Sequence, residues 1–397
     1  MTAKGGRGGR GSRGLVPLGA FYLFFFATIG FQLPWFPPYL QSIGFGSALI
    51  GAALAMGSIS RVFLPPLWGL LADRIGRARL ILAGGSLLGG ACLVLVGHTT
   101  APAAVLGLLF LGGFFLVPLV PLAETLTMAA LGDRRERYGQ VRLWGSLGFI
   151  VTAWGFGNLV PRVGLAPVPL LAGTCLALAG LVALAAPCPA RAPASRERRL
   201  PGPGTPFPWR RFGPLLAAAA LGQGSHGAYY AFFTLELEAR GVSPALAGFL
   251  WALGVLAEVL LMAVSPRILR RLGAVAAFRL ALVAALARWL LYAAEPPLAL
   301  VAVGQILHAL TFGLLHLASI QLVDRWSPPG RKATGQGLLS ALAYGLGIGG
   351  GLFLAGLGRD PLGDRGLYLA AAGLVLLALA VALGLGRDRD ETDAGVP

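Results

Sequence analysis

Residues 69–79 read GLLADRIGRAR, a short charged segment where one long apolar stretch, near residues 46–72, gives way to the next, near 79–98. Apolar stretches of this kind recur along the whole chain, and each is long enough to cross ~30 Å of hydrocarbon as a helix. The 397 residues are 56% hydrophobic and 12% charged, whereas an ordinary soluble domain is about a quarter charged. Lipid is therefore the expected solvent, and the expected fold class is an all-α membrane protein.

Charged or Pro/Gly-rich breaks divide the chain into twelve predicted spans. Those of the first half lie near residues 15–41, 46–72, 79–98, 102–131, 141–160 and 166–187, and those of the second near 213–238, 244–265, 274–293, 297–323, 335–357 and 366–386. Between the halves, residues 187–211 read PCPARAPASRERRLPGPGTPFPWRR, too rich in proline, glycine and charge for a membrane helix. We therefore expect a disordered leader at 1–14, six-helix bundles at 15–187 and 213–386, a linker at 188–212 and a tail at 387–397.

The net charge of +16 comes mainly from arginines in the loops between apolar stretches. With the predicted spans, 25 Lys and Arg residues fall on the side of both termini and the linker, and four fall on the other side. This asymmetry predicts cytoplasmic termini in a multi-pass protein of the plasma (inner) membrane. Nucleic-acid binding is not expected, because the arginines form no single groove or stripe. The expected partners are membrane lipids and a small-molecule substrate, and we expect a monomer.

The charged loop at residues 69–79 resembles the loop between helices 2 and 3 of the major facilitator superfamily, whose pattern is G-x-L-A-D-R-x-G-R-[RK]. The matching gating-motif residues are Gly69, Asp73, Arg74, Gly76 and Arg77, and Ala78 departs from the pattern. A decayed copy, PRILRRLG, stands at residues 266–273 and supports an internal duplication. The resemblance implies the fold of that superfamily, with twelve transmembrane helices in two pseudo-symmetric six-helix bundles.

Ionisable groups at membrane depth cost several kcal/mol unless they are paired or hydrated, so each is a functional candidate. We single out seven of them as candidates: Glu124, Arg142, His226, Glu258, Arg288, His308 and His316. Arg61 and Arg279 lie nearer span ends, where the side chain can reach the headgroups. Such residues, contributed by both halves, are expected to meet in one cavity near the membrane midplane.

Part of this set resembles the lactose permease and its relatives. Glu124 and Arg142 have the spacing of the carboxylate and arginine that clamp the sugar there, which implies substrate binding. Glu258, Arg288 and His308 match the remaining polar core, which implies proton coupling. The chain has Thr311 where that permease carries its proton-bearing glutamate, and Gln305 replaces a lysine. Because neither side chain titrates, the expected proton carrier is Glu258 or His308.

A narrower resemblance, over roughly residues 17–355, is to the phenylpropionate permease family. It rests on VPLVPLAE at residues 117–124, YGQVRLWGS at 138–146, QGSHGAYY at 223–230 and GFLWALG at 248–254. These segments imply a substrate site that includes His226, Tyr229, Tyr230 and Trp144 besides the acid and arginine. Glu124 stands where that family usually has aspartate.

Each candidate also has a structural interpretation. Glu124 and Arg142 can form an ion pair that fixes two helices, and Glu258 can have a similar structural role. A histidine such as His226 or His308 can bridge helices by hydrogen bonding, and for His316 we favour packing. Tyr22, Tyr229, Tyr230, Trp144, Trp251 and Phe312 can line an aromatic site or belong to the interfacial belt.

These observations predict a secondary active transporter that works by alternating access, a proton symporter of a small organic solute. An aromatic carboxylate such as 3-phenylpropionate suits two intramembrane arginines, because guanidinium holds carboxylate in a bidentate fashion. The alternatives are symport of a carbohydrate or a nucleoside, drug efflux, and a membrane sensor that transports nothing. No enzyme is expected, because the phosphate-binding pattern G-x-x-x-x-G-K-[ST], the metalloprotease pattern H-E-x-x-H and the nucleophile elbow are absent from the sequence. Residues 345–350, GLGIGG, fit the dinucleotide pattern G-x-G-x-x-G, but they lie inside an apolar span without the strand that such a site needs. We expect neither a metal nor a cofactor, with the proton as the coupling ion.

Overall fold

The computed structural model describes residues 15–63, 68, 77–132, 134–187 and 206–386. Regular structure in these residues is helical, and each of the twelve predicted spans corresponds to helix. Eight described stretches are long and apolar enough to cross a membrane, and two shorter apolar helices match the second and sixth predicted spans. The predicted leader and tail and most of the predicted linker lie outside the described residues.

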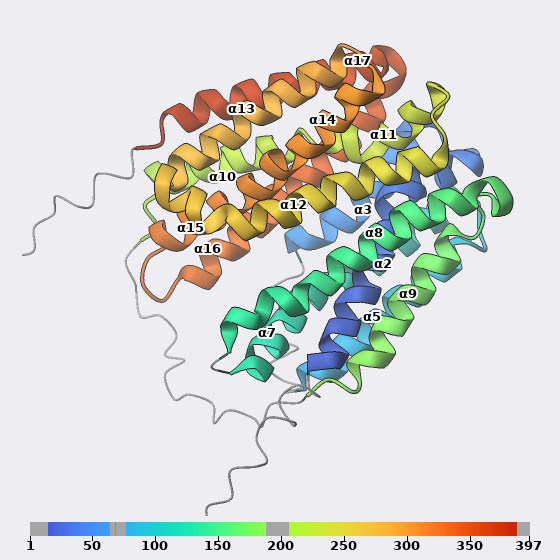
Figure 1. The fold of residues 1–397 in the computed structure, drawn as a ribbon, viewed down its shortest axis with the longest axis horizontal. Helices are drawn as coiled ribbons and strands as arrows, with labels where there is room; N and C mark the ends of the chain where they lie inside the picture. The colour runs from blue at the N-terminus through green and yellow to red at the C-terminus, as the bar shows by residue number, and fades with distance from the viewer. Residues whose placement is uncertain (1–14, 64–67, 69–76, 133, 188–205, 387–397) are drawn as a thin grey trace, which may run out of the picture. The chain divides into compact units, whose positions relative to one another are not determined.

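Unit 1 is the first of two compact units and comprises Met1–Gly44, Phe63–Glu197 and Val242–Ala252. Its helices are α2 (Leu15–Ser42), α5 (Ala78–Val96), α6 (Pro102–Leu116), α7 (Leu119–Leu131), η1 (Arg135–Arg137), α8 (Tyr138–Val163), α9 (Val168–Ala183) and the first turns of α12 (Pro244–Leu272). Within this unit α2 packs against both α8 and α9, and α9 packs against α5 (Figure 1). The helix α2 is therefore the central packing partner of unit 1.

Small residues allow α2 and α8 to approach closely. A Cβ atom added at Gly148 would lie 2.1 Å from the Leu23 carbonyl oxygen. Four residues further along α8, Thr152 donates a hydrogen bond to the Ala27 carbonyl over 3.0 Å. Helices in lipid associate through such backbone contacts and interhelical hydrogen bonds, because lipid tails are as apolar as the side chains.

Unit 2 comprises Phe45–Val62, Arg198–Gly241 and Leu253–Pro397. Its helical segments are α3 (Ser47–Phe63), α10 (Trp209–Gly224), α11 (Gly227–Ala239), the rest of α12, α13 (Ala274–Ala293), α14 (Leu298–His308), η2 (Ala309–Leu314), α15 (Leu315–Trp326), α16 (Lys332–Leu339), η3 (Ser340–Gly347) and α17 (Ile348–Leu383). The helix α17 packs against α10, α11 and α13 (Figure 1). Two segments therefore belong to a different unit from their neighbours in the sequence. The helix α3 lies in the first half of the chain but belongs to unit 2, and residues 242–252 lie in the second half but belong to unit 1.

The long helix α17 contains the end of the predicted eleventh span and most of the twelfth, as far as Leu383. Gly363, with φ 67° and ψ 175°, breaks the helix between them. A positive φ is readily adopted by glycine, which has no Cβ atom. At the far end, Arg279 of α13 donates to the carbonyl oxygens of Ala382 and Leu385, so it caps the C-terminus of α17. The predicted boundary between the last two spans is thus confirmed as a kink.

Two π-helical segments, η2 and η3, interrupt the tenth and eleventh spans. Each is continuous with α-helix on both sides, so the span is not broken but locally widened. Such segments occur frequently at functional sites, because the extra residue per turn redirects side chains. The first of them directly follows His308 and contains Thr311, two residues singled out by their chemistry in the sequence.

Candidate functional site

The first polar cluster lies in unit 1, where α2, α7 and α8 contact one another. Tyr138 donates a hydrogen bond to Glu124 Oε1 over 3.1 Å. The guanidinium carbon of Arg142 lies 4.0 Å from the centroid of the Phe26 ring and 5.4 Å from that of Tyr22. Among the described residues, no ion pair joins Glu124 to Arg142. The structural ion pair weighed for these two residues is therefore not formed.

Gly145 makes the position of the Arg142 guanidinium possible. A Cβ atom at Gly145 would lie 2.7 Å from Arg142 Nη1 and 2.8 Å from Cδ2 of Phe26. Any larger residue would therefore push the guanidinium or the ring aside. The glycine stands in the YGQVRLWG segment on which the family resemblance rests.

Trp144 lies apart from this cluster. Its side chain is 50% exposed, and it contacts α2 at Gly19, where an added Cβ would lie 3.1 Å from Trp144 Cδ1. Two residues along an α-helix correspond to ~200° of rotation, so Trp144 and Arg142 leave α8 on different faces. The structure does not bring Trp144 together with the predicted acid and arginine.

The second polar cluster lies in unit 2 and joins an acid, a histidine and an arginine in one chain. His308 Nε2 lies 3.0 Å from Glu258 Oε1, and Arg288 Nη1 lies 2.9 Å from His308 Nδ1. Arg288 Nη1 also donates to Thr311 Oγ1 over 3.2 Å, and His226 Nε2 lies 3.3 Å from the same oxygen. These side chains come from α12, α13, α14, η2 and the turn between α10 and α11.

The donor and acceptor roles in this chain follow from the chemistry of its members. A guanidinium has five N–H donors and no acceptor. His308 Nδ1 must therefore accept from Arg288, which leaves the ring proton on Nε2. That Nε2–H then donates to the Glu258 carboxylate. In this arrangement His308 is neutral, and it is hydrogen-bonded to a cation through Nδ1 and to an anion through Nε2.

Arg288 is fully buried in an aromatic surround that we call the arginine cage, formed by Tyr229, Trp289 and Tyr292. Its guanidinium carbon lies 4.3, 4.8 and 5.3 Å from the three ring centroids, respectively. The Nε and Nη2 groups form no hydrogen bond of standard geometry among the described residues, although the Tyr292 side chain lies close enough to interact with the guanidinium. A buried N–H group without an acceptor costs about 1–3 kcal/mol, and more on a charged group. The cage therefore contains a cation that is incompletely satisfied.

The remaining predicted residues of the second half join the same cluster. The Tyr230 ring stacks on His226, with centroids 5.7 Å apart, and the His226 ring packs edge-on against Trp289 at 5.0 Å. Unit 2 thus brings together six predicted site residues: His226, Tyr229, Tyr230, Glu258, Arg288 and His308. That they share one chamber with Glu124 and Arg142 of unit 1 stays a prediction.

Gln305, noted in the sequence as a departure from the lactose permease pattern, links two tyrosines of the arginine cage. Tyr229 donates to Gln305 Oε1 over 2.8 Å, and Gln305 Nε2 donates to the Tyr292 hydroxyl over 2.9 Å. The amide is fully buried. An amide has both a donor and an acceptor, whereas an ammonium only donates, so glutamine can hold two hydroxyl groups here.

His316, for which packing was favoured, has a specific partner. Its Nδ1 forms a hydrogen bond with the Tyr344 hydroxyl, and its ring stacks on Phe312 with centroids 6.3 Å apart. Phe312 in turn stacks on His308 at 5.5 Å. The residue therefore combines packing with a hydrogen bond between α15 and η3.

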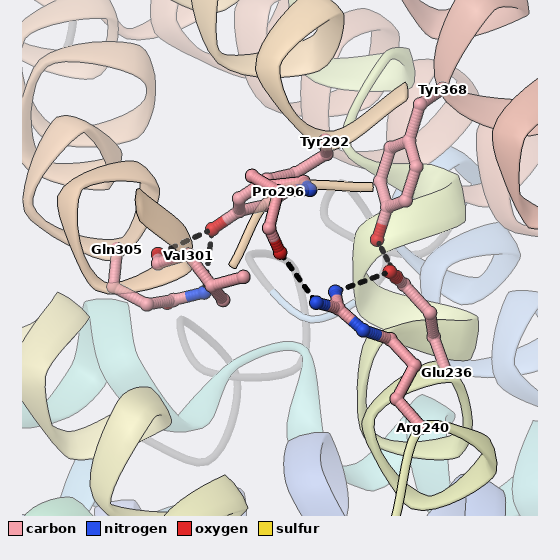
Figure 2. Close-up of polar contacts among 7 residues, drawn as sticks. All are labelled: Glu236, Arg240, Tyr292, Pro296, Val301, Gln305 and Tyr368. Atoms are coloured by element: carbon pink, nitrogen blue, oxygen red, sulfur yellow. Dashed lines mark hydrogen bonds and ion pairs between the residues drawn. The ribbon is translucent and has the colours of Figure 1, made fainter. Parts of the chain in front are cut away.

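The sequence reasoning missed a further acid, Glu236 of α11. Figure 2 shows it accepting from Tyr368 and paired with Arg240, which also donates to the Pro296 carbonyl. Glu236 lies two residues before the end of the predicted seventh span, 213–238, where an acid is ordinary. Two features of the sequence point to Glu236. The acid lies inside the predicted span, and an arginine follows it at the i+4 spacing of a helical ion pair.

The gating-motif prediction lies largely outside the described residues. Gly69, Asp73, Arg74 and Gly76 all fall within 69–76. Arg77 is described, is exposed and occupies the N-cap position of α5. The motif's arrangement thus stays a prediction.

No group of three or more His, Cys, Asp or Glu side chains in the described part of the chain is arranged to hold a metal ion. Cys92 is buried and Cys175 is half-buried, both as free thiols. That the protein works without a metal or cofactor stays a prediction.

Comparison with known proteins places these clusters in a family. The description "MFS_1 like family" matches residues 15–370. The chain is 33% identical over 313 residues to the probable 3-phenylpropionic acid transporter of Escherichia coli (strain K12), covering 76% of this chain and 80% of that protein. It is 28% identical over 338 residues to the maltose permease of Geobacillus stearothermophilus, covering 82% and 83%.

The fold is similar to that of a solved transporter. The crystal structure of the nucleoside transporter NupG superposes with a TM-score of 0.79 at 19% identity and covers 94% of this chain and 98% of that one. This agreement confirms the predicted all-helical transporter fold. The family match and the similarity to transporters over most of the chain also confirm that the protein is not an enzyme. The chain belongs to the MFS_1-like family of the major facilitator superfamily and is a multi-pass membrane transporter.

Proposed function

We propose that the protein is a proton-coupled symporter of a small organic carboxylate that carries an aromatic ring, such as 3-phenylpropionate. The observation that carries this proposal is Arg288, a fully buried guanidinium whose Nε and Nη2 groups form no hydrogen bond within the described part of the chain. A carboxylate is the acceptor that best matches two neighbouring guanidinium donors, because both of its oxygens can bind at once.

The surroundings of the arginines support a ligand that is both anionic and aromatic. Arg288 is bordered by the ring faces of Tyr229 and Trp289, and Arg142 lies over Phe26. Rings of this kind offer edge and face contacts to a phenyl group. The similarity to a probable 3-phenylpropionic acid transporter is consistent with such a ligand.

Charge balance in unit 2 gives a reason for proton coupling. Without substrate, the Arg288 cation and the Glu258 anion compensate each other through neutral His308. A substrate carboxylate at Arg288 would leave one uncompensated negative charge, and protonation of Glu258 restores neutrality. A proton on Glu258 without substrate would leave an uncompensated cation. Because uncompensated charge is costly at membrane depth, substrate and proton bind and leave together.

His308 would keep its hydrogen bonds in each state. When the substrate carboxylate binds Nε and Nη2 of Arg288, the Nη1 group still donates to His308 Nδ1, so the link between substrate and Glu258 is kept. When Glu258 is protonated, its remaining oxygen still accepts from His308 Nε2–H. Glu258 is therefore proposed as the proton carrier and His308 as the residue that links it to Arg288.

Carbohydrate symport is a second candidate, favoured by the unit 1 cluster. Glu124 is half-buried and has Tyr138 as its hydrogen-bond partner, so its second oxygen can accept from a hydroxyl group. The similarity to a maltose permease over 82% of the chain is consistent with this use. The two candidates differ in whether Arg288 or Glu124 provides the main substrate contact.

Uptake into proteoliposomes under an imposed inward proton gradient tests the proposal. Labelled 3-phenylpropionate is expected to accumulate, and a protonophore is expected to abolish accumulation, with protein-free liposomes as the control for passive entry of the acid. The neutral analogue 3-phenylpropionamide tests the carboxylate alone. Equal transport of the amide, or accumulation of maltose or uridine in place of the acid, would contradict the proposal.

A further inference from the structure

Glu236 is a second buried acid of unit 2, separate from the Glu258–His308–Arg288 chain. Its side chain is 11% exposed, in the last turns of α11. It belongs to a polar group, drawn in Figure 2, that joins α11 to α17 and to the connection between α13 and α14. Buried carboxyl groups are uncommon and need either partners or a proton.

The two oxygens of Glu236 are held unequally. Oε2 accepts from the Tyr368 hydroxyl over 2.8 Å, which is a short, well-formed hydrogen bond. Oε1 lies 3.5 Å from Arg240 Nη1, at the long limit for such a contact. The same guanidinium donates through Nη2 to the Pro296 carbonyl, and its side chain is 28% exposed. The cation is therefore shared between the acid and a backbone oxygen.

The other groups that face Glu236 do not balance its negative charge. Asp364 of α17 acts on Glu236 as a second negative charge, although it is itself paired with Arg359 at 2.9 Å. Tyr292 of α13 lies near enough for electrostatic interaction and adds no cation. An acid in this setting can exist as an anion bound to Tyr368 and Arg240 or as a neutral acid, with a small structural difference between the two.

The group is in contact with the arginine cage. The Tyr368 ring lies edge-on to Tyr292, with centroids 5.3 Å apart, and parallel to Trp289 at 6.1 Å. Both of these rings border Arg288. Gly304 leaves room for Tyr292, since an added Cβ would lie 2.3 Å from its ring. A shift of Tyr368 therefore reaches the residues that surround the proposed substrate anchor.

We propose that Glu236 is a second proton-binding residue of the transport cycle. As an anion it holds α11, α17 and the α13–α14 connection together through Tyr368 and Arg240. Uptake of a proton from water neutralises it and releases Arg240 to Pro296 alone, which loosens this junction next to the arginine cage. The inference rests on the proposed proton coupling and adds a second coupled proton to the one on Glu258.

Reversal-potential measurements in proteoliposomes test the number of coupled protons. Substrate flux is nulled by known pH gradients and membrane potentials, which gives the protons moved per substrate. Wild type is expected to move one proton more than Glu236→Gln, whereas Glu236→Asp, which keeps a titratable group, is expected to match wild type. Exchange of internal for external substrate, which needs no net proton movement, is expected to survive in Glu236→Gln.

Two further variants distinguish protonation from a structural role and do not depend on the folding of Glu236→Gln. Arg240→Gln and Tyr368→Phe each remove a group that favours the anion, so both are expected to shift the pH profile of uptake to higher pH. A wild-type stoichiometry in Glu236→Gln, or unshifted profiles in both other variants, would overturn the inference while leaving the proposed function intact. Substrate uptake without any proton movement in wild type would overturn both.

Discussion

The two polar clusters contain the same kinds of charged side chain but hold them differently. In unit 1, Glu124 binds a tyrosine hydroxyl and Arg142 lies on a phenyl ring, and among the residues that the structure describes no ion pair joins the two charges. In unit 2, Glu258 and Arg288 are joined through His308 by two contacts of 3.0 and 2.9 Å. Both charges of unit 1 are half-buried, whereas Arg288 is fully buried.

From this difference we expect the two clusters to have different roles in the proposed transport cycle. Members of a hydrogen-bonded chain respond to one another, because a change at one end alters the donors and acceptors available at the other. Groups without a shared partner respond separately. We therefore expect changes in unit 1 to alter substrate affinity, and changes in unit 2 to alter affinity and proton coupling together.

The largest effect is expected from Arg288→Lys. The ammonium keeps the charge but not the planar fork, so a single nitrogen must serve both His308 Nδ1 and the substrate carboxylate. Disrupting a buried charge pair costs about 2–5 kcal/mol, so initial uptake of labelled 3-phenylpropionate should fall on the order of 100-fold. Arg142→Lys, reconstituted in equal amounts, is the matched variant, and its initial uptake should fall about tenfold. Equal losses in the two would remove the distinction between the units.

A large and qualitatively different effect is expected from Glu258→Gln. The amide oxygen still accepts from His308 Nε2–H, but the side chain no longer binds a proton. Accumulation against a gradient should disappear, while substrate exchange stays within about twofold of wild type. Glu124→Gln is the comparison variant. It should bind substrate more weakly than wild type but still accumulate substrate against a gradient. The assignment of the proton carrier fails if Glu258→Gln still concentrates substrate under a pH gradient.

An intermediate effect is expected from Gly145→Ala, which adds one methyl group where the Arg142 guanidinium lies. The added Cβ would lie 2.7 Å from Nη1, so the guanidinium must move off Phe26. We expect KM for uptake to rise about fivefold, the effect of ~1 kcal/mol of lost binding energy, with coupling unchanged. Gly155→Ala on the same helix is the control, because nothing lies within 4 Å of the added atom. A loss of coupling in Gly145→Ala would contradict the different roles expected of the two clusters.

The smallest effect is expected from Trp144→Leu. This side chain is half exposed and lies outside the unit 1 cluster, so uptake and KM should change by less than about twofold. Trp251→Leu provides the contrast, because Trp251 is 3% exposed and its truncation leaves a cavity. A tenfold rise of KM in Trp144→Leu would show that this tryptophan belongs to the substrate site after all.

The helical spans could be predicted from the sequence with small errors, because their cause is local. A stretch of 20 or so apolar residues must satisfy its backbone groups within itself in lipid, and a helix does so. The least apolar predicted span, residues 213–238, appears as α10 and α11 with a turn at Ser225 and His226. That turn is not visible in the apolar pattern, and it positions His226 toward Thr311.

The candidate site could be predicted as a set of residue types but not as a set of contacts. The cost of a charge in lipid singled out Glu258, Arg288 and His308 without any knowledge of their neighbours. Glu236 was missed for the opposite reason, because it lies near a span end, where an acid is ordinary. Its burial depends on Tyr368, more than a hundred residues further along the chain.

The sequence by itself determined that the protein is a bundle of membrane helices, to which family it belongs, and which few ionisable side chains lie within the spans. The tertiary structure decided their partners: Arg288 with His308 and an aromatic cage, Arg142 with Phe26, and Glu236 with Tyr368. Helical periodicity fixes only the face on which a side chain leaves its own helix. A hydrogen bond requires heavy atoms within about 3 Å of each other, and that distance depends on how helices from distant parts of the chain pack.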